Sequence, residues 1–465
     1  MTGVSKQKQI QHLYLRAGFG SGYQTYNSSL TLEKHVDLIF QNAASIYPLS
    51  LVDKSTLPSE DYKDLSAERK SEIAAESLKY DKELNVMWLS QLTETDAVFR
   101  EKMTLFWHGH FACRSLNPVF TQDLNNIQRQ YALGKFKDLL LQVSKSAAML
   151  DFLNNQQNRK KHPNENFARE LMELFTLGRG NYTEQDIKES ARAFTGWGFD
   201  KKGDFEFHPE RHDSGEKTFF GKTGNFNGED ILDILLQQKT CAHFICSKAY
   251  RFFVNDEPDE GCVNTLTDSF YESGYDIAAL MKTILTSEWF YDKKNIGVKI
   301  KSPIELLVGL NRSFGVKYED PNVLIYIQKL LGQQLFAPPN VSGWAGGKNW
   351  IDSSSLMLRL KLPSIVLNNG IIALAEKEEP EEYKMLKSQE ELKVQSKVQR
   401  KVKAIASWEK FEADVPKDMT KAQLADFLLQ REPPKEILDL ISEPGNGTIK
   451  SAALELLSLP EYQLC

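Results

Sequence analysis

Two histidines lie close together in an aromatic run of the sequence, His108 and His110 within WHGHF, residues 107–111. Side chains two positions apart face the same way on extended backbone but not on a helix. We expect the preceding helix to end at Gly109, which would let the two imidazoles converge. Imidazole is the commonest metal ligand near neutral pH. A metal site is therefore one interpretation, and structural or simply exposed rings are the alternative.

Acidic side chains recur at helical spacing in NENFARELMELFTLG, residues 164–178, where the pattern predicts a helix that ends at a glycine. Asn166, Glu170 and Glu173 fall on one side of this helix. Glu170 also borders the apolar side. A carboxylate at the edge of a buried face must be paired, protonated or bound to a metal.

The other side of the same helix carries Glu165 and Arg169, four residues apart. This spacing predicts an ion pair along the helix surface. The alternative interpretation of the whole helix is a solvated acidic face with no role in chemistry.

A third polar group, His212 and Asp213, lies in RHDSG, residues 211–215. We expect it at the tip of a hairpin near 203–222, with Lys217 just beyond. Asp and Gly favour turns, so the group could be only a turn. It could also offer a histidine and a carboxylate to a site formed by helices.

Together these groups supply a mixed set of nitrogen and oxygen ligands of the kind that iron, manganese, zinc or copper accepts. The set consists of His108, His110, Glu170 and His212. The E-x-x-H spacing of di-iron helical proteins is missing on the acidic helix, so a mononuclear site is favoured.

The remaining polar residues then receive roles around the metal. Asp213 or Glu173 would orient a ligand or act as general base. Arg169 or Lys217 would hold an anionic group of the substrate. The reaction would be hydrolysis by metal-bound water, or oxidation with a redox metal.

Other catalytic motifs are missing from the sequence, including GxGxxG, Walker A, G-x-S-x-G and H-E-x-x-H. Several Trp and Arg residues in Gly-rich surroundings could instead line a carbohydrate or peptide groove, although Trp is more often core packing. These residues are Arg16, Arg192, Trp197, Trp344 and Trp350.

The composition is that of a soluble globular protein: 465 residues, 41% hydrophobic and 26% charged, with a formal charge of −6. The acidic balance disfavours a nucleic-acid binder. No apolar run reaches the ~18 residues of a transmembrane helix. The N-terminal stretch lacks the apolar region of a signal peptide. We therefore expect a cytoplasmic protein as written, with export by a partner or a trimmed signal as alternatives.

Helical periodicity dominates the chain and predicts a mainly α protein, a large multi-helical single domain with a small β-hairpin insertion. The predicted core domain spans 1–375, with the hairpin near 203–222 pairing GDFEFHPE with EKTFFGK. Residues 376–412, acidic and then basic, predict an exposed charged helix or insertion. Residues 413–465 predict C-terminal helices that pack on the core.

Six segments in this order make the sequence resemble the bacterial domain-of-unknown-function 1800 (DUF1800) family over nearly its whole length. They are HLYLRAGFG, LFWHGHFA, NENFARELMELFTLG, TEQDIKESARAFTGW, HDSGEKTFFG and APPNVSGWAGGKNWI. The segment 376–412 is least like the family.

The resemblance implies a bacterial, mostly helical protein with no settled activity. It also implies a possible partner, an exported protein similar to sulfatases and phosphatases and encoded nearby. The positions that match the family motifs include the polar residues above and add Glu165 as a candidate metal ligand.

Two functions from different classes follow. The first is a metal-dependent enzyme, a hydrolase or oxidoreductase, built on the histidine and carboxylate set. The second is a non-catalytic binding or assembly factor for an envelope polymer or a surface protein. In that case the Trp/Gly loop at 343–350 and the segment 376–412 would be its contact surfaces, and the His and Glu residues would form a buried hydrogen-bond network.

Overall fold

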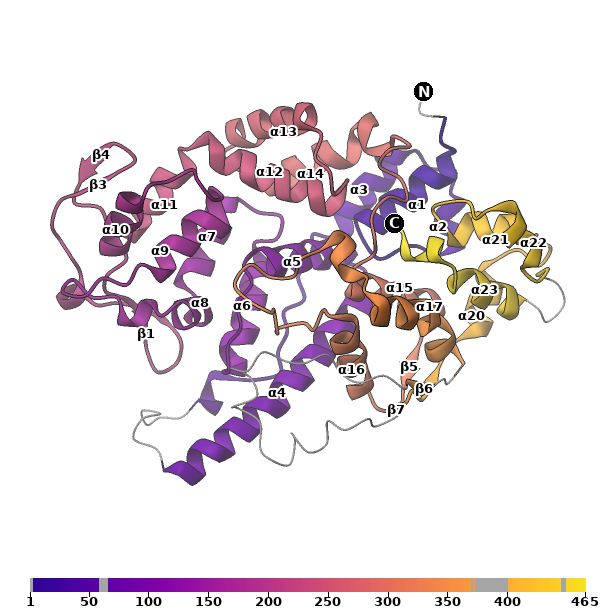
Figure 1. The fold of residues 1–465 in the computed structure, drawn as a ribbon, viewed down its shortest axis with the longest axis horizontal. Helices are drawn as coiled ribbons and strands as arrows, with labels where there is room; N and C mark the ends of the chain where they lie inside the picture. The colour runs from indigo at the N-terminus through magenta and orange to yellow at the C-terminus, as the bar shows by residue number, and fades with distance from the viewer. Residues whose placement is uncertain (1–2, 58–65, 369–370, 373–399, 445–448) are drawn as a thin grey trace.

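The computed structural model describes residues 3–57, 66–368, 371–372, 400–444 and 449–465. Most of these residues are helical, and the strands form only small two-stranded sheets, so the predicted mainly α class is confirmed (Figure 1). The predicted segment 376–412 falls largely outside the described residues. Its described part, from residue 400, forms two short strands and the start of a helix.

The N-terminal third is helical and includes one long helix, α4. Its elements are α1 (Lys6–Arg16), α2 (Tyr23–Tyr26), α3 (Leu32–Asn42), η1 (Lys54–Thr56), α4 (Ala67–Glu94), α5 (Val98–His110), α6 (Pro118–Gln130), α7 (Phe136–Lys145), α8 (Ala147–Phe152) and η3 (Asn155–Gln157).

The middle third holds the two short hairpins and a π-helix. Its elements are α9 (Asn166–Glu170), the π-helix η4 (Leu171–Thr176), α10 (Glu184–Ala193), β1 (Trp197–Phe199), β2 (Phe205–Phe207), η5 (Pro209–Arg211), β3 (Lys217–Phe219), β4 (Lys222–Gly224), α11 (Gly228–Leu236), α12 (Lys239–Phe253), α13 (Glu260–Glu272), α14 (Ile277–Thr286) and η6 (Glu288–Tyr291).

The last third returns to helices. Its elements are α15 (Pro303–Phe314), β5 (Lys317–Tyr318), α16 (Asn322–Leu331), η7 (Gly347–Trp350), α17 (Ser353–Leu367), β6 (Ile371–Ile372), β7 (Arg400–Lys401), β8 (Ala404–Ile405), α20 (Trp408–Asp414), α21 (Lys421–Leu428), α22 (Lys435–Leu440), α23 (Ile449–Leu457) and η8 (Pro460–Gln463).

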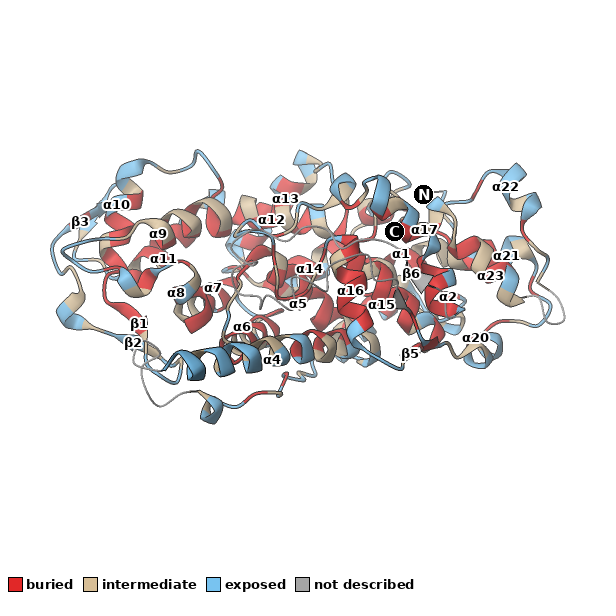
Figure 2. Ribbon diagram, turned by 60° about the horizontal axis from the view of Figure 1, so that its bottom comes forward, coloured by how far each residue is buried: buried red, intermediate tan, exposed pale blue. Residues whose placement is uncertain are grey.

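The buried apolar side chains form two clusters along an elongated body (Figure 2). The first is built mainly by α5–α14, and the second by α4, α15–α17, α20, α21 and α23. Helix α5 contributes to both, with Trp107 in the first cluster and Leu105 in the second. The C-terminus lies beside α1 (Figure 1), where Arg16 donates a hydrogen bond to the backbone oxygen of Cys465.

The predicted pairing of the hairpin near 203–222 is wrong. Strand β2 pairs with the preceding β1, and β3 pairs with the following β4. The turn between β3 and β4 consists of Phe220 and Gly221, both with positive φ, as a two-residue hairpin requires. The sequence pattern places Phe219 and Phe220 in one strand, but the strand ends at Phe219 and Phe220 belongs to the turn.

The start of α10 is capped by residues that are close to one another in the sequence. Helix α10 begins with a capping box: the Asp186 amide donates to Thr183 Oγ1 over 3.1 Å, and the Thr183 amide donates to Asp186 Oδ2 over 2.9 Å. Among the described residues, the structure contains no helix with the length and apolar character needed to cross a membrane.

Candidate functional site

His108 and His110 do not converge, because α5 continues through His110 instead of ending at Gly109. At about 100° per residue, two residues apart on a helix point about 200° apart. The ring of His108 packs against Trp88 and Trp344, with centroids 5.0 Å and 5.4 Å away. Its Nε2 accepts the Phe336 amide over 3.2 Å. Burial lowers the pKa of His108 to about 3, so the ring is neutral.

His110 belongs to a different network on the other side of α5. Its Nε2 donates to the Phe175 carbonyl over 3.1 Å, and its Nδ1 accepts from Lys248 Nζ over 3.2 Å. Lys248 also donates to the Leu174 carbonyl over 3.1 Å. Both carbonyls lie in the last turn of the π-helix η4, where helix carbonyls have no partner within the helix and can accept from side chains. Burial lowers the pKa of Lys248 to about 8.

The acidic helix forms local ion pairs. The predicted pair is confirmed, with Arg169 Nη2 3.3 Å from Glu165 Oε2. Arg169 also pairs with Glu184 on α10 over 2.9 Å. Glu173 accepts from Arg179 over 2.9 Å and from the Tyr182 hydroxyl over 2.6 Å.

The two carboxyls of that helix have opposite electrostatic environments. Hydrogen bonds from Tyr182 and Arg179 lower the pKa of Glu173. Burial, and then repulsion from Glu173, raise the pKa of the half-buried Glu170. Glu170 is therefore more easily protonated than Glu173.

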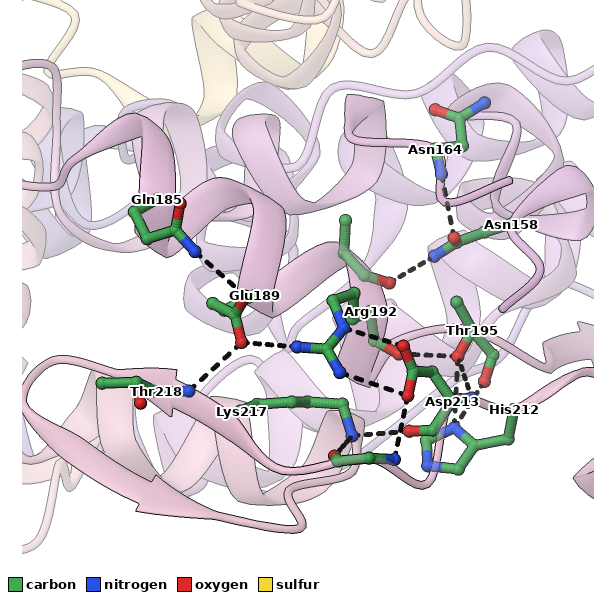
Figure 3. Close-up of polar contacts among 12 residues, drawn as sticks. Asn158, Asn164, Gln185, Glu189, Arg192, Thr195, His212, Asp213, Lys217 and Thr218 are labelled. Carbon is green, nitrogen blue, oxygen red and sulfur yellow. Dashed lines mark hydrogen bonds and ion pairs between the residues drawn. The ribbon is translucent and has the colours of Figure 1, made fainter. Parts of the chain in front are cut away.

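The third predicted group is drawn together into a network around Arg192 (Figure 3). Arg192 donates two hydrogen bonds to Asp213, with Nε 2.7 Å from Oδ2 and Nη2 3.3 Å from Oδ1. Its Nη1 donates to Glu189 Oε2 over 2.8 Å. Lys217 Nζ donates to the Asp213 carbonyl over 2.6 Å. The hydrogen bond from Arg192 lowers the pKa of Asp213.

His212 joins this network through its backbone neighbours. Its Nδ1 lies 2.9 Å from the Thr195 carbonyl, which can only accept, so Nδ1 carries the hydrogen and Nε2 keeps its lone pair. The Asp213 amide donates to Thr195 Oγ1 over 2.7 Å. The network is called the α10 network below and joins α10 to the start of β3; it consists of Glu189, Arg192, Thr195, His212, Asp213 and Lys217.

The structure therefore does not bring the four members of the predicted metal set, His108, His110, Glu170 and His212, together at one place. In the part of the chain that the structure describes, no group of three or more His, Cys, Asp or Glu side chains is placed to hold a metal. The physical reason is that His108 and His110 lie on opposite sides of α5 with ring nitrogens already bonded, while His212 belongs to the α10 network.

The Trp/Gly loop covers the end of α5. Gly343 has a φ of +76°, and a Cβ there would lie 2.6 Å from the Gly109 carbonyl, so only glycine allows this approach. Trp344 packs on His108, and Trp350 is buried. Two sequence motifs that were candidates for chemistry thus pack against each other.

Sequence reasoning missed a groove at the surface near the C-terminus. It has a volume of about 640 Å³ and is assembled from four separate segments of the chain. Its lining residues are Ile300, Ile351, Leu356, Arg431, Glu432, Pro433, Pro434, Lys435, Pro460, Glu461, Gln463 and Leu464. No sequence signal marks it, because its walls come together only in the folded chain.

Sequence reasoning also missed Lys248 and three buried cations next to α15, which are Lys102, Lys301 and Arg359. A lysine or arginine in an amphipathic helix looks like any surface cation until its neighbours are known. Arg16 was considered only as part of a groove, yet its side chain is fully buried.

The sequence matches one known protein family over most of its length. The sequence profile of a family described as a protein of unknown function (DUF1800) matches residues 12–464. No curated protein and no solved structure gave a significant match. Because the profile spans nearly all of the elements above, from α1 to η8, the chain belongs to the DUF1800 family.

Proposed function

We propose that this chain is a non-catalytic binding or assembly factor whose partner is a protein, held as an extended segment in the groove near the C-terminus. The observation that carries the proposal is the composition of that groove. Ile351, Leu356 and Leu464 supply apolar surface, and Pro433 and Pro434 lack amide donors. Extended peptides commonly dock in grooves of this kind.

The lining charges favour a polypeptide over an envelope polymer. Arg431 and Lys435 are balanced by Glu432 and Glu461, so the groove offers no net charge to a polyanion. Its lining also contains no aromatic ring on which a sugar could stack. Of the two partner classes expected from the sequence, a surface protein fits better. The sulfatase/phosphatase-like protein that the resemblance implies is a candidate source of the segment.

The residues that the sequence suggested for a metal site form structural hydrogen bonds instead, which supports a non-catalytic function. His108 joins α5 to the segment at Phe336, and His110 joins α5 to the π-helix. Arg192 and Asp213 join α10 to the segment before β3. Buried polar groups that bond to one another in this way specify a single packing.

The experiment is a peptide selection followed by affinity measurement on variants of the full chain. A displayed library of random peptides is panned on the wild-type protein, and one selected peptide is labelled. Leu356→Glu should weaken its binding by about tenfold or more, because the change puts a charge into the apolar lining. Leu356 is only partly buried, so this variant should fold, which thermal unfolding checks.

Met357→Glu is the matched control. Met357 is the next residue of α17, is 52% exposed and does not line the groove, so the same charge there should leave affinity unchanged. The proposal fails if no peptide is selected, or if the peptide binds both variants equally. Binding of a soluble peptidoglycan fragment that Leu356→Glu abolishes would instead identify a polymer as the ligand.

A further inference from the structure

The groove near the C-terminus is built from four segments that lie far apart in the sequence. Its lining comes from Ile300, from Ile351 and Leu356, from residues 431–435 and from residues 460–464. These segments must be held in fixed places if the groove is to exist before a partner arrives. Arg359 connects three of them, although it does not itself line the groove and its side chain is fully buried.

Arg359 lies on α17, three residues after Leu356, and its guanidinium reaches two other segments of the groove. Its Nε donates to Gln463 Oε1 over 3.1 Å, and Gln463 Nε2 donates back to the Arg359 carbonyl over 3.3 Å. Its Nη2 donates to the carbonyl of Lys301, the residue after Ile300. One buried side chain therefore ties three of the four segments together.

Backbone pairing joins two of these segments directly. Ile300 and Leu464 form an antiparallel bridge, and the Lys301 amide donates to the Gln463 carbonyl over 2.8 Å. The Lys301 ammonium also donates to the Tyr462 carbonyl over 2.7 Å. Residues directly opposite each other in an antiparallel pair present their side chains on the same face. The apolar side chains of Ile300 and Leu464 therefore lie side by side in the lining of the groove.

The fourth segment, residues 431–435, is positioned in another way. Gly297 has a φ of +62°, and a Cβ there would lie 2.8 Å from the Cγ of Arg431. Glycine allows both the backbone conformation and the close approach. The stem of Arg431 thus packs against the chain shortly before Ile300, so this wall does not depend on Arg359.

A fully buried guanidinium is a costly way to stabilise a fold. Replacing a buried ionic group by apolar residues of similar volume is often neutral or stabilising. Within the described residues, the hydrogen bonds of the Arg359 guanidinium go to neutral groups, the carbonyl of Lys301 and the amide side chain of Gln463. What the side chain supplies is geometry, because its rigid planar fork fixes the positions of the groups that it bonds.

We propose that Arg359 is a positioning residue of the groove: it fixes three lining segments in the arrangement that accepts an extended partner segment, without touching that segment. This inference rests on the proposed function. A groove that is already formed binds faster, because a larger fraction of the free molecules is competent to bind. Loosening the groove should therefore slow association. It should leave dissociation unchanged, because the contacts within the complex stay the same.

The test measures association and dissociation rate constants of the full chain with the labelled peptide selected on wild-type protein. Arg359→Lys keeps the charge but lacks the fork, so it cannot bond both partners. We expect its association rate constant to fall by about fivefold or more, with the dissociation rate constant within about twofold of wild type. Thermal unfolding checks that the variant is folded.

Arg312→Lys is the matched control. Arg312 is also an arginine that donates to backbone carbonyls, those of Thr93 and Thr95, over 2.7 Å and 3.1 Å. It ties α15 to the end of α4 and does not bond any segment of the groove lining. Both of its rate constants should therefore stay within about twofold of wild type.

A measurement on the wild-type chain keeps the test decisive if Arg359→Lys does not fold. A groove that is formed in advance predicts slow hydrogen exchange at the Lys301 amide, both with and without the peptide. Protection that appears only with the peptide would overturn the inference. Wild-type rate constants in Arg359→Lys would also overturn it, and so would a change in the dissociation rate constant alone, which is typical of a contact residue. A wild-type chain that binds no peptide would overturn the proposed function, and this inference with it.

Discussion

The α10 network and the cation cluster beside α15, which consists of the buried Arg16, Lys102, Lys301 and Arg359, contain the same cationic residue types under opposite conditions. Arg192 is 27% exposed and faces the carboxylates of Asp213 and Glu189, and its hydrogen bond to Asp213 raises the pKa of the guanidinium. Arg359 is fully buried, and burial lowers its pKa to about 10. Both residues are arginines, but the balance between burial and charged partners reverses the direction of the pKa shift.

The two clusters also differ in how completely their charges and donors are paired. In the α10 network each charge has a partner inside the chain, and the result is a link between a helix and the segment before β3. Beside α15 the cations outnumber the carboxylates, and buried donors of Arg16 and Arg359 have no partner within the described residues. Burying a charge or a donor without a partner costs stability, so the two clusters contribute differently to the fold.

Glu305→Gln should produce the largest effect on stability. It removes the negative charge that pairs with the buried Lys102, while the Gln amide oxygen can still accept from the Ser302 amide at the start of α15. Breaking a buried ion pair costs about 3–5 kcal/mol. The measurement is the free energy of unfolding in urea.

The matched control for this variant is Glu319→Gln, because Glu319 pairs with Lys403 at the surface with both side chains more than half exposed. We expect it to cost less than about 1 kcal/mol. An equal loss of stability in both variants would show that the buried pair of Lys102 and Glu305 contributes no more than a surface pair, which would contradict the prediction.

The pH dependence of Lys301 should give the next largest effect. Its pKa is about 8 in the folded chain and near 10.4 when unfolded, so between these values the unfolded state holds more protons. The free energy of unfolding therefore rises with pH in this window, by about 2–3 kcal/mol. The measurement compares wild type with Lys301→Met at about pH 7 and about pH 10. A wild-type minus variant difference that does not change with pH would show that Lys301 is not desolvated.

Asp213→Asn should have a smaller effect, about 1–2 kcal/mol, because the network that it disrupts is partly exposed. The loss should appear locally, as faster hydrogen exchange in β3 and β4. The lowered pKa of Asp213 means that its contribution is present above about pH 4 and is lost as the pH falls through the folded pKa.

Glu165→Gln is the control for Asp213→Asn. The pair of Glu165 with Arg169 has both side chains more than a third exposed, so its loss should cost at most about 0.5 kcal/mol. Unchanged exchange in β3 and β4 of Asp213→Asn would show that the α10 network does not hold the hairpin.

Local signals in the sequence predicted much of the fold and little of the sites. The helix of residues 164–178, the cap of α10 and the Glu165–Arg169 pair depend on residues within about four positions of each other, so they could be read directly. The end of α5 could not, because Gly109 in a helix is opposed only by a modest propensity that tertiary packing overrides.

The sequence by itself determined the helical class, the helix caps and membership of the DUF1800 family. Only the tertiary structure decided which charged residues meet. Lys102 and Glu305 are 203 positions apart, and Arg16 reaches a carbonyl 449 positions away. Such contacts arise when distant helices pack around a shared core, and no local pattern encodes them. The groove and the cation cluster beside α15 both follow from that packing.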